Sequence, residues 1–114
     1  MGARRRSEET IMPRITLVRY PTKPERADEN EKLSRAVYAA LRAEAPAHIA
    51  YALFRDGVNF VHLFVNLRDD SSDAVTELPS FKAFTAGLSE RCPAPPETMR
   101  ISPQLVDSYG FASA

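Results

Sequence analysis

The chain has 114 residues, a formal net charge of zero and a single cysteine. A domain of this length buries roughly 65% of the surface that its unfolded chain exposes, so it can form one hydrophobic core. The balanced charge gives no basic footprint for nucleic acid, and no run approaches the ~20 apolar residues of a membrane span. A lone cysteine excludes an intrachain disulfide and fits a reducing compartment, so we expect a cytoplasmic protein.

The N-terminal part of the chain changes character near residue 13. The stretch MGARRRSEET has neither apolar periodicity nor the apolar centre of a signal peptide. We expect residues 1–12 to form a disordered leader and residues 13–114 to form a single domain. Residues 14–20 (RITLVRY) alternate β-forming side chains between two faces, which predicts a first strand that Pro21 ends.

A first helix is predicted from about residue 28 onward. Asp28 and Glu31 have the spacing of a capping box, in which side chains satisfy the free backbone N–H groups at a helix start. Apolar residues then recur three and four positions apart up to Ala45, and Pro46 ends the helix. The residues of this stripe are Leu33, Ala36, Val37, Ala40 and Leu41.

Residues 51–66 (YALFRDGVNFVHLFVN) carry the strongest signal in the chain. Two apolar runs flank Asp56-Gly57, and Asp-Gly between such runs predicts a β-hairpin. If Asp-Gly forms the two-residue turn that it favours, Tyr51 lies directly opposite His62.

Strand alternation makes both faces of this hairpin apolar. We expect the helices to cover the face with the small residues Ala50 and Ala52, where backbones can approach closely. A sheet that is apolar on both sides needs a second cover, and the chain has only one layer of helices to offer. We therefore expect a homodimer through the bulkier face, which carries Tyr51, Leu53, Phe60, His62 and Phe64.

A second helix follows a polar loop, RDDSSDAVTE. Leu78-Pro79 opens this helix, because proline suits the first helical position, and Pro93 ends it. Phe81, Phe84 and Leu88 recur on one helical face and predict its buried side.

The end of the chain predicts a last strand at residues 98–101. Pro103 interrupts it and cannot donate to a hydrogen-bond ladder, which favours a place at the edge of the sheet. We expect residues 105–111 to resume extended character and to pair with a partner subunit. The complete order is β-α-β-β-α-β, which is typical of the ferredoxin-like α+β fold: an antiparallel four-stranded sheet with two helices on one face.

Several segments resemble the dimeric α/β barrels that include antibiotic biosynthesis monooxygenase-like domains. They are the turn TKPERADEN, the strand FVHLFVN, the helix start LPSFKAF and the final DSYGF. The resemblance covers about residues 14–111. It implies a homodimer whose two sheets face each other as a barrel, with a ligand cavity between each sheet and its own helices.

The same resemblance implies a function. A small apolar or aromatic metabolite is the expected ligand, and a cofactor-independent monooxygenase is the expected activity, with no cofactor and no metal. Two alternatives remain open on the same scaffold: a non-catalytic dimeric module in a stress-response or accessory role, and an isomerase of the muconolactone-isomerase kind. Members of this group often use Asn, Trp, Tyr or His in the cavity, and this chain has no tryptophan.

His62, Tyr51 and Asn66 are the candidate catalytic residues. An imidazole beside a phenol can supply a general base and a hydrogen-bond donor, and histidine titrates near neutral pH. The structural alternative is a core histidine whose hydrogen bonds are satisfied by Tyr51. The predicted position of this face in the dimer interior favours that alternative.

The candidate ligand-binding residues are Tyr20, Arg55, Tyr38 and Phe84. Each has a structural alternative. Tyr20 can simply end a strand, and Arg55 can be a solvated charge beside a turn. Tyr38 and Phe84 can be core residues. Cys92 has no neighbouring base in the sequence, and two histidines without clustered partners give no metal-ligand spacing.

Overall fold

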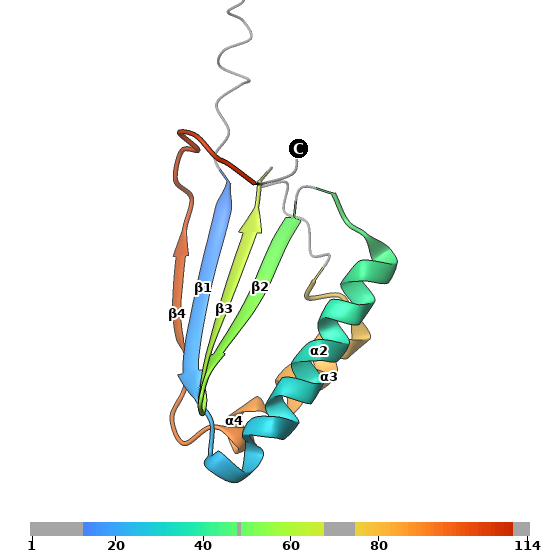
Figure 1. Ribbon diagram of the computed structural model, residues 1–114, viewed down its shortest axis with the longest axis vertical. Helices are drawn as coiled ribbons and strands as arrows, with labels where there is room; N and C mark the ends of the chain where they lie inside the picture. Colours follow the sequence, from blue (N-terminus) through green and yellow to red (C-terminus); the bar gives the residue numbers. More distant parts are fainter. Residues whose placement is uncertain (1–12, 48, 68–74, 111–114) are drawn as a thin grey trace, which may run out of the picture.

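The structure is a computed structural model that describes residues 13–47, 49–67 and 75–110. Its strands form one four-stranded sheet in the order β2-β3-β1-β4, and all neighbouring strands are antiparallel. Figure 1 shows the helices packed beside this sheet. The predicted element order and the ferredoxin-like α+β fold are confirmed. The elements are β1 (Arg14–Pro21), η1 (Pro24–Arg26), α2 (Ala27–Glu44), β2 (Ile49–Asp56), β3 (Asn59–Asn66), α3 (Pro79–Ala86), α4 (Leu88–Arg91) and β4 (Glu97–Ile101).

The start of helix α2 differs from the prediction. Pro24 opens a short 3₁₀ turn, and Arg26, not Asp28, precedes the first residue of α2, without a side-chain cap. Asp28 and Glu31 both accept hydrogen bonds from the guanidinium of Arg55, at 3.0 and 2.7 Å. The predicted capping box was wrong because a contact with β2 engages both carboxylates.

The end of α2 is confirmed. Ala45 has a left-handed backbone with φ of 49°, and its N–H donates to the carbonyl of Leu41 at 2.6 Å before Pro46 follows. The buried stripe of the helix is displaced from the predicted one, since Ala36 is exposed. The fully buried residues are Ala27, Asn30, Ser34 and Val37.

The β2–β3 hairpin forms as predicted, but in a different register. Tyr51 lies opposite Phe64, and His62 lies opposite Leu53, so each pairing differs from the predicted one by two residues. Because side chains alternate with a period of two, this displacement leaves every residue on its predicted face.

The turn of the hairpin explains the register. Asp56 pairs with Asn59, so Gly57 and Val58 are the two central residues of the turn. Gly57 has a φ of 64° and Val58 does not have a positive φ, which is the pattern of a type II′ turn. The carbonyl of Val58 accepts the backbone N–H of Thr22 at 2.8 Å, which fixes the turn against the end of β1.

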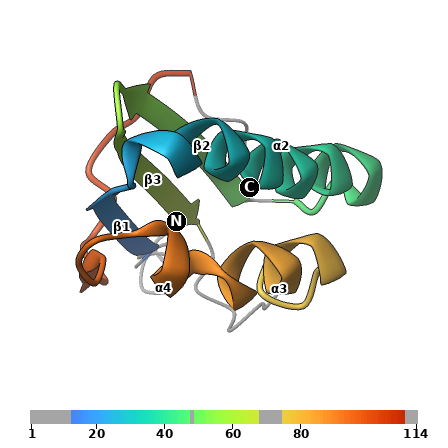
Figure 2. The same cartoon turned by 90° about the horizontal axis from the view of Figure 1, so that it is seen from below.

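The helices cover the bulkier face of the sheet, which corrects the prediction. Figure 2 shows α2 and the α3–α4 pair side by side on one side of the sheet. Phe60 is fully buried beneath them, and Tyr51, Leu53 and Phe64 pack against the same core. The prediction was wrong because it assigned small residues to the sheet. In the structure the helix supplies them, as Ala27 and Ser34 lie on the buried stripe of α2.

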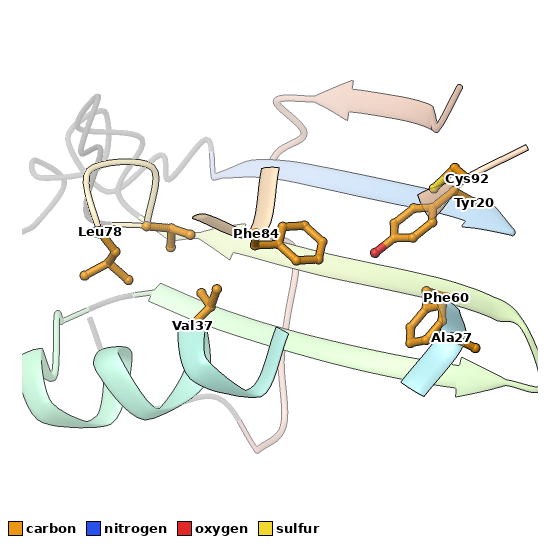
Figure 3. Close-up of a cluster of buried hydrophobic side chains, with 8 residues drawn as sticks. Tyr20, Ala27, Val37, Phe60, Leu78, Phe84 and Cys92 are labelled. Atoms are coloured by element: carbon orange, nitrogen blue, oxygen red, sulfur yellow. The ribbon is translucent and has the colours of Figure 1, made fainter. Parts of the chain in front are cut away.

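The core lies between the sheet and the helices, as Figure 3 shows for its buried side chains. Tyr20 extends from the end of β1 toward Phe84 of α3, and Phe60 lies close to Ala27. The rings of Tyr20 and Phe60 stack at 5.8 Å between centroids. The described core residues come from both layers: Tyr20, Ala27, Val37, Phe60, Val75, Leu78, Phe84 and Cys92.

The second predicted helix is divided at Gly87 into α3 and the four-residue α4. Pro79 begins α3 as predicted, and α4 ends at Arg91, two residues before Pro93. A Cβ at position 87 would lie 3.2 Å from Nη1 of Arg91. Glycine therefore leaves room for the Arg91 guanidinium beneath the helix.

The other face of the sheet has no cover among the described residues. β4 is an edge strand, as predicted, and it adds Met99 and Ile101 to this face. Phe54 is 57% exposed and Met99 is 49% exposed. The apolar residues of the open face, as we call it, are Ile15, Leu17, Ala50, Ala52, Phe54, Val61, Leu63, Val65, Met99 and Ile101, of which Val65 is buried. Arg19, Glu97, Asp56 and Asn59 lie on the same face at its hairpin end.

Two further predictions concern the chain ends and the membrane. The predicted leader, residues 1–12, and Phe111 of the final extended segment lie outside the described residues, and no strand forms within residues 102–110. None of the helices in the described part of the chain has the length and apolarity needed to cross a membrane.

Candidate functional site

A cavity of about 350 Å³ lies between the helix-facing side of the sheet and the segment that leads into α3. Its volume falls in the roughly 300–1,000 Å³ range of small-molecule pockets. Strands β1, β3 and β4 form most of its floor. The lining residues are Arg14, Thr16, Val18, Tyr51, His62, Phe64, Val75, Thr76, Phe81 and Arg100.

Tyr51 and His62 contact each other in the wall of this cavity. Oη of Tyr51 lies 3.1 Å from Nδ1 of His62. The two residues are diagonal rather than direct neighbours, because His62 pairs with Leu53 across the hairpin. Diagonal side chains on one sheet face remain within reach of aromatic rings. The predicted contact is therefore confirmed, although the register that suggested it was wrong.

The second ring nitrogen of His62 is bound by Tyr20. Oη of Tyr20 lies 2.7 Å from Nε2 of His62 and also accepts a hydrogen bond from Nδ2 of Asn30 at 3.0 Å. Nε of Arg91 donates to Oδ1 of Asn30 at 2.9 Å. We call these residues the hydrogen-bond chain; from α4 to the cavity it consists of Arg91, Asn30, Tyr20, His62 and Tyr51.

The sheet and α2 together position this chain. Val18 pairs with His62 and Tyr20 pairs with Phe60, so Tyr20 and His62 are diagonal neighbours on the helix-facing side. Asn30 enters from the buried stripe of α2 and is fully buried. Ser34 donates to the backbone carbonyl of Asn30 at 2.8 Å, one helical turn away.

Burial keeps the three ring groups of the chain uncharged at neutral pH. It lowers the pKa of His62 from 6.5 to about 4, because the imidazolium form would lose its solvation. Burial raises the pKa of Tyr51 to about 12, and it raises the pKa of Tyr20 further. His62 is therefore a neutral imidazole with one protonated nitrogen and one acceptor nitrogen.

Arg91 carries the positive charge at the far end of the chain. It is only 1% exposed, and desolvation lowers its pKa below the usual value. Nη2 donates to the backbone carbonyl of Phe84 at 2.7 Å, and the guanidinium lies 5.1 Å from the centroid of the Phe84 ring. Within the described residues, no carboxylate forms an ion pair with Arg91. Its charge is therefore balanced by neutral dipoles and a ring face, and by the carboxylate of Glu29 at longer range.

The remaining predicted catalytic residue, Asn66, does not join this group. It is fully buried at the end of β3, where it pairs with Arg14 and Ile49, and it does not line the cavity. The predicted ligand-binding residue Phe84 lies in the core, with its ring 5.5 Å from that of His62. Phe84 supports the imidazole from the helix side and does not line the cavity.

Tyr38 and Arg55, the other predicted ligand-binding residues, line a different cavity of about 460 Å³ along α2 and the edge strand β2. Arg55 is ion-paired with Asp28 and Glu31. The Tyr38 hydroxyl is buried without a hydrogen-bond partner within 3.5 Å among the described residues, and it interacts with the neighbouring Tyr51 hydroxyl. Tyr51 lines both cavities and separates them.

Sequence reasoning missed Asn30 and Arg91. Asn30 and Ser34 lie between Ala27 and Val37 at helical spacing. Polar residues at positions of a buried helical stripe indicate buried hydrogen bonds, so the sequence contained a signal for Asn30. Arg91 had no such signal, because an arginine at the end of a short helix is usually solvated. The described residues contain no group of three or more His, Cys, Asp or Glu side chains that could hold a metal ion.

The sequence and the fold were compared with those of known proteins. No protein-family model matches the sequence, and no curated protein matches it. A candidate antibiotic biosynthesis monooxygenase from Caulobacter crescentus CB15 matches with a TM-score of 0.69 and 17% identity, over 91% of this chain and 100% of that chain. An antibiotic biosynthesis monooxygenase matches with a TM-score of 0.61 and 20% identity, over 77% and 95% of the two chains.

A conserved protein from Methanosarcina mazei Go1 also matches, with a TM-score of 0.67 and 16% identity, over 81% of this chain and 93% of that chain. Identities this low relate the proteins by fold alone. The resemblance seen in the sequence is confirmed at that level: the chain has the ferredoxin-like fold of antibiotic biosynthesis monooxygenase-like proteins.

Proposed function

We propose that this domain binds a small aromatic metabolite in the cavity between the sheet and α3, and that it oxygenates this ligand without a cofactor. The observation that carries the proposal is the convergence of Tyr51 and His62 on a cavity of about 350 Å³. A pocket with a few convergent polar groups and groups of shifted pKa is the usual form of a binding site.

The cavity walls support an aromatic ligand. Phe64 and Phe81 offer ring faces, and Val18 and Val75 offer apolar contacts. Aromatic rings favour offset or edge-on contacts with other rings. The polar groups gather on the sheet side of the cavity, so a hydroxylated ring fits with its oxygen toward Tyr51.

A hydroxylated aromatic substrate also supports the chemistry. Deprotonation of a phenol makes the ring system electron-rich enough to reduce dioxygen directly. For a CH₂ group conjugated to such a ring, the balanced reaction is CH₂ + O₂ → C=O + H₂O, in which the substrate supplies all four electrons. No separate reductant is needed, so the protein has to bind and orient the anion and exclude water.

A second copy of the chain is proposed on the open face of the sheet. This face carries apolar side chains on all four strands beside the Arg19–Glu97 ion pair, and Phe54, Met99 and Ile101 are each more than two-fifths exposed. Apolar patches of this kind are uncommon on monomers. Two sheets that face each other through these residues would form the barrel that the resemblance implies. The dimer would leave both cavities on the outer, helix-covered sides.

Oxygen uptake tests the proposed activity. The purified chain is mixed with a hydroxylated anthrone, which carries the CH₂ group that the reaction requires, in an oxygen-electrode cell. We expect uptake that depends on the enzyme and decreases at least tenfold in Tyr51→Phe and in His62→Ala. Tyr109→Phe is the matched control, because Tyr109 is fully exposed and does not line the cavity. Equal uptake in wild type and Tyr51→Phe would contradict the proposed site.

One observation favours a second candidate function, non-catalytic binding of the same ligand. Both ring nitrogens of His62 are already engaged by tyrosine hydroxyls, so the imidazole has no free position for direct proton abstraction. Titration calorimetry with the same aromatic compound separates the two functions. Binding without oxygen uptake identifies a carrier, and uptake above the rate without protein identifies an oxygenase.

A further inference from the structure

The hydrogen-bond chain has a fixed direction. An arginine can only donate, so the Asn30 atom that faces Arg91 must be its oxygen. The amide nitrogen of Asn30 then points to Tyr20 and donates to its hydroxyl oxygen. The orientation of two groups therefore follows from one donor-only side chain.

This direction also determines the protonation of His62. The Tyr20 hydroxyl accepts from Asn30, so its own proton needs an acceptor, and Nε2 of His62 is the one that the described structure places beside it, at 2.7 Å. A buried hydroxyl without an acceptor would cost free energy. Nε2 is thus the acceptor nitrogen of the neutral ring, and Nδ1 carries the proton. Nδ1–H donates to the hydroxyl oxygen of Tyr51.

We propose that Tyr51 presents its hydroxyl proton to the cavity and that the site selects ligands with an anionic oxygen, a phenolate or an enolate. Tyr20 acts as a positioning residue for this selection, because it holds the tautomer of His62. The inference rests on the proposed function, since it takes the cavity as the binding site. It adds the donor that recognises the anionic oxygen and the role of a residue that does not line the cavity.

The contacts of Tyr51 support a hydroxyl proton that is available to a ligand. Within the described structure, Nδ1 of His62 lies within hydrogen-bond distance of its hydroxyl oxygen, and the neighbouring Tyr38 hydroxyl also interacts with it. The rings of Tyr38 and Tyr51 lie 4.9 Å apart, and the interaction favours the ionised form of Tyr51 and disfavours that of Tyr38, so Tyr38 is the donor. With His62 and Tyr38 both donating to the Tyr51 oxygen, the Tyr51 proton is available to a ligand.

The charges around the site support an anion. Each donor in the hydrogen-bond chain polarises the next, and the chain begins at the Arg91 guanidinium, so the terminal O–H becomes a better donor. Among the residues that the structure describes, those that line the cavity include Arg100 and no Asp or Glu. A hydrogen bond to an ionised oxygen is roughly twice as strong as one between neutral groups.

4-Nitrophenol tests this selection, because its phenolate absorbs visible light and its phenol does not. The probe is titrated with pH in the presence of saturating protein and without protein. We expect the phenolate to bind about tenfold more tightly than the phenol, which lowers the pKa of the bound probe. Bound probe with an unchanged pKa would overturn the inference and leave the binding site of the proposed function intact. Absence of binding would overturn both.

Three variants locate the source of the preference. Tyr51→Phe removes the donor, and we expect phenolate and phenol to bind equally. Tyr20→Phe frees Nε2 of His62, so the ring can change tautomer and accept the Tyr51 proton. We expect the same loss of preference there, whereas a merely structural effect would weaken both forms of the probe alike. Tyr109→Phe, the control, keeps the tenfold preference.

The tautomer itself is measurable in the unliganded wild-type protein, and a variant serves only to assign the signals. Nitrogen-15 chemical shifts distinguish an imidazole protonated at Nδ1 from one protonated at Nε2. The chain has two histidines, so His62→Gln assigns the signals. A proton on Nδ1 of His62 supports the inference. A proton on Nε2 would overturn it, because Tyr51 would then donate to the ring and not to the ligand.

Discussion

The hydroxyl of Tyr20 lies 2.7 Å from Nε2 of His62 and joins the end of β1 to the middle of β3 beneath the helices. This contact links the core of the domain to its cavity, because His62 lines the cavity and Tyr20 does not. Tyr20 in turn reaches Asn30 on α2, so the helix layer holds the imidazole through this phenol as well as through the ring of Phe84. Ligand binding and folding stability are thereby connected through the same side chains.

Stability should depend on pH through His62. Folding lowers the pKa of His62 from 6.5 to about 4, so the unfolded chain binds more protons between these values. The free energy of unfolding should therefore decrease as the pH falls from 6.5 to 4, by about 3 kcal/mol from this residue. Urea unfolding at a series of pH values measures it. His62→Gln, which cannot titrate, should lack this part of the decrease; an identical slope in both proteins would contradict the burial of a neutral imidazole.

The pair of Asn30 and Arg91 should be strongly coupled. Asn30→Ala leaves a buried guanidinium without its acceptor, and we expect a loss of about 2–4 kcal/mol in unfolding free energy. Arg91→Met removes the charge together with its desolvation penalty, so its loss should be smaller, about 1–2 kcal/mol. The double variant should lose less than the sum of the two. Chemical denaturation of the four proteins gives the coupling energy.

Arg35→Met is the matched control for Arg91→Met. Arg35 is an exposed residue of α2 that pairs with Glu31 four positions earlier. Exposed helix pairs contribute about 0.3–0.5 kcal/mol, so this variant should unfold almost like the wild type. Strict additivity of Asn30→Ala and Arg91→Met would show that the two side chains do not act together.

The open face should control association. Phe54→Asp and Met99→Asp place a charge on the two edge strands of the sheet, at side chains that are already exposed in one chain. Each variant should remain folded and should elute with the mass of one chain in light scattering, whereas the wild type has twice that mass. Ala39→Asp, on the exposed side of α2, should stay dimeric. A monomeric wild type would refute the proposed dimer.

The hairpin turn should require a left-handed residue at position 57. A Cβ at Gly57 would meet no atom within 4 Å, so any penalty comes from its φ of 64°. Gly57→Ala and Gly57→Asn should each lower the unfolding free energy by about 1–2 kcal/mol, because asparagine tolerates the αL conformation of a type I′ turn but not the first central position of a type II′ turn. A much smaller loss in Gly57→Asn than in Gly57→Ala would argue against a type II′ turn.

The sequence predicted the elements of the fold because each has a local signal. Asp56-Gly57 between apolar runs identified the hairpin. Pro79 identified the start of a helix, and Pro46 and Pro93 identified where helices end. These local signals did not determine the register of the hairpin. Asp-Gly and Gly-Val can each form its two-residue turn. The structure has the Gly-Val turn, which is held by a contact between Thr22 and Val58 that is distant in the sequence.

Local signals also did not show which face of the sheet the helices cover. Both faces of the hairpin are apolar, so periodicity assigns residues to faces without showing which face the helices meet. The candidate pair of Tyr51 and His62 was found because both lie on one hairpin. Tyr20, Asn30 and Arg91 join His62 only through the pairing of β1 with β3 and the packing of α2 and α4, which no single stretch of sequence contains.

Binding mapped by NMR tests the central claim, which is a ligand site between the sheet and α3. Backbone amide shifts of the nitrogen-15-labelled chain are followed during a titration with 2-naphthol. We expect the largest changes at Thr16, Val18, His62, Phe64 and Phe81, which line the cavity from both layers. Changes confined to the open face around Leu63 and Met99, or no changes with any hydroxylated aromatic, would contradict it.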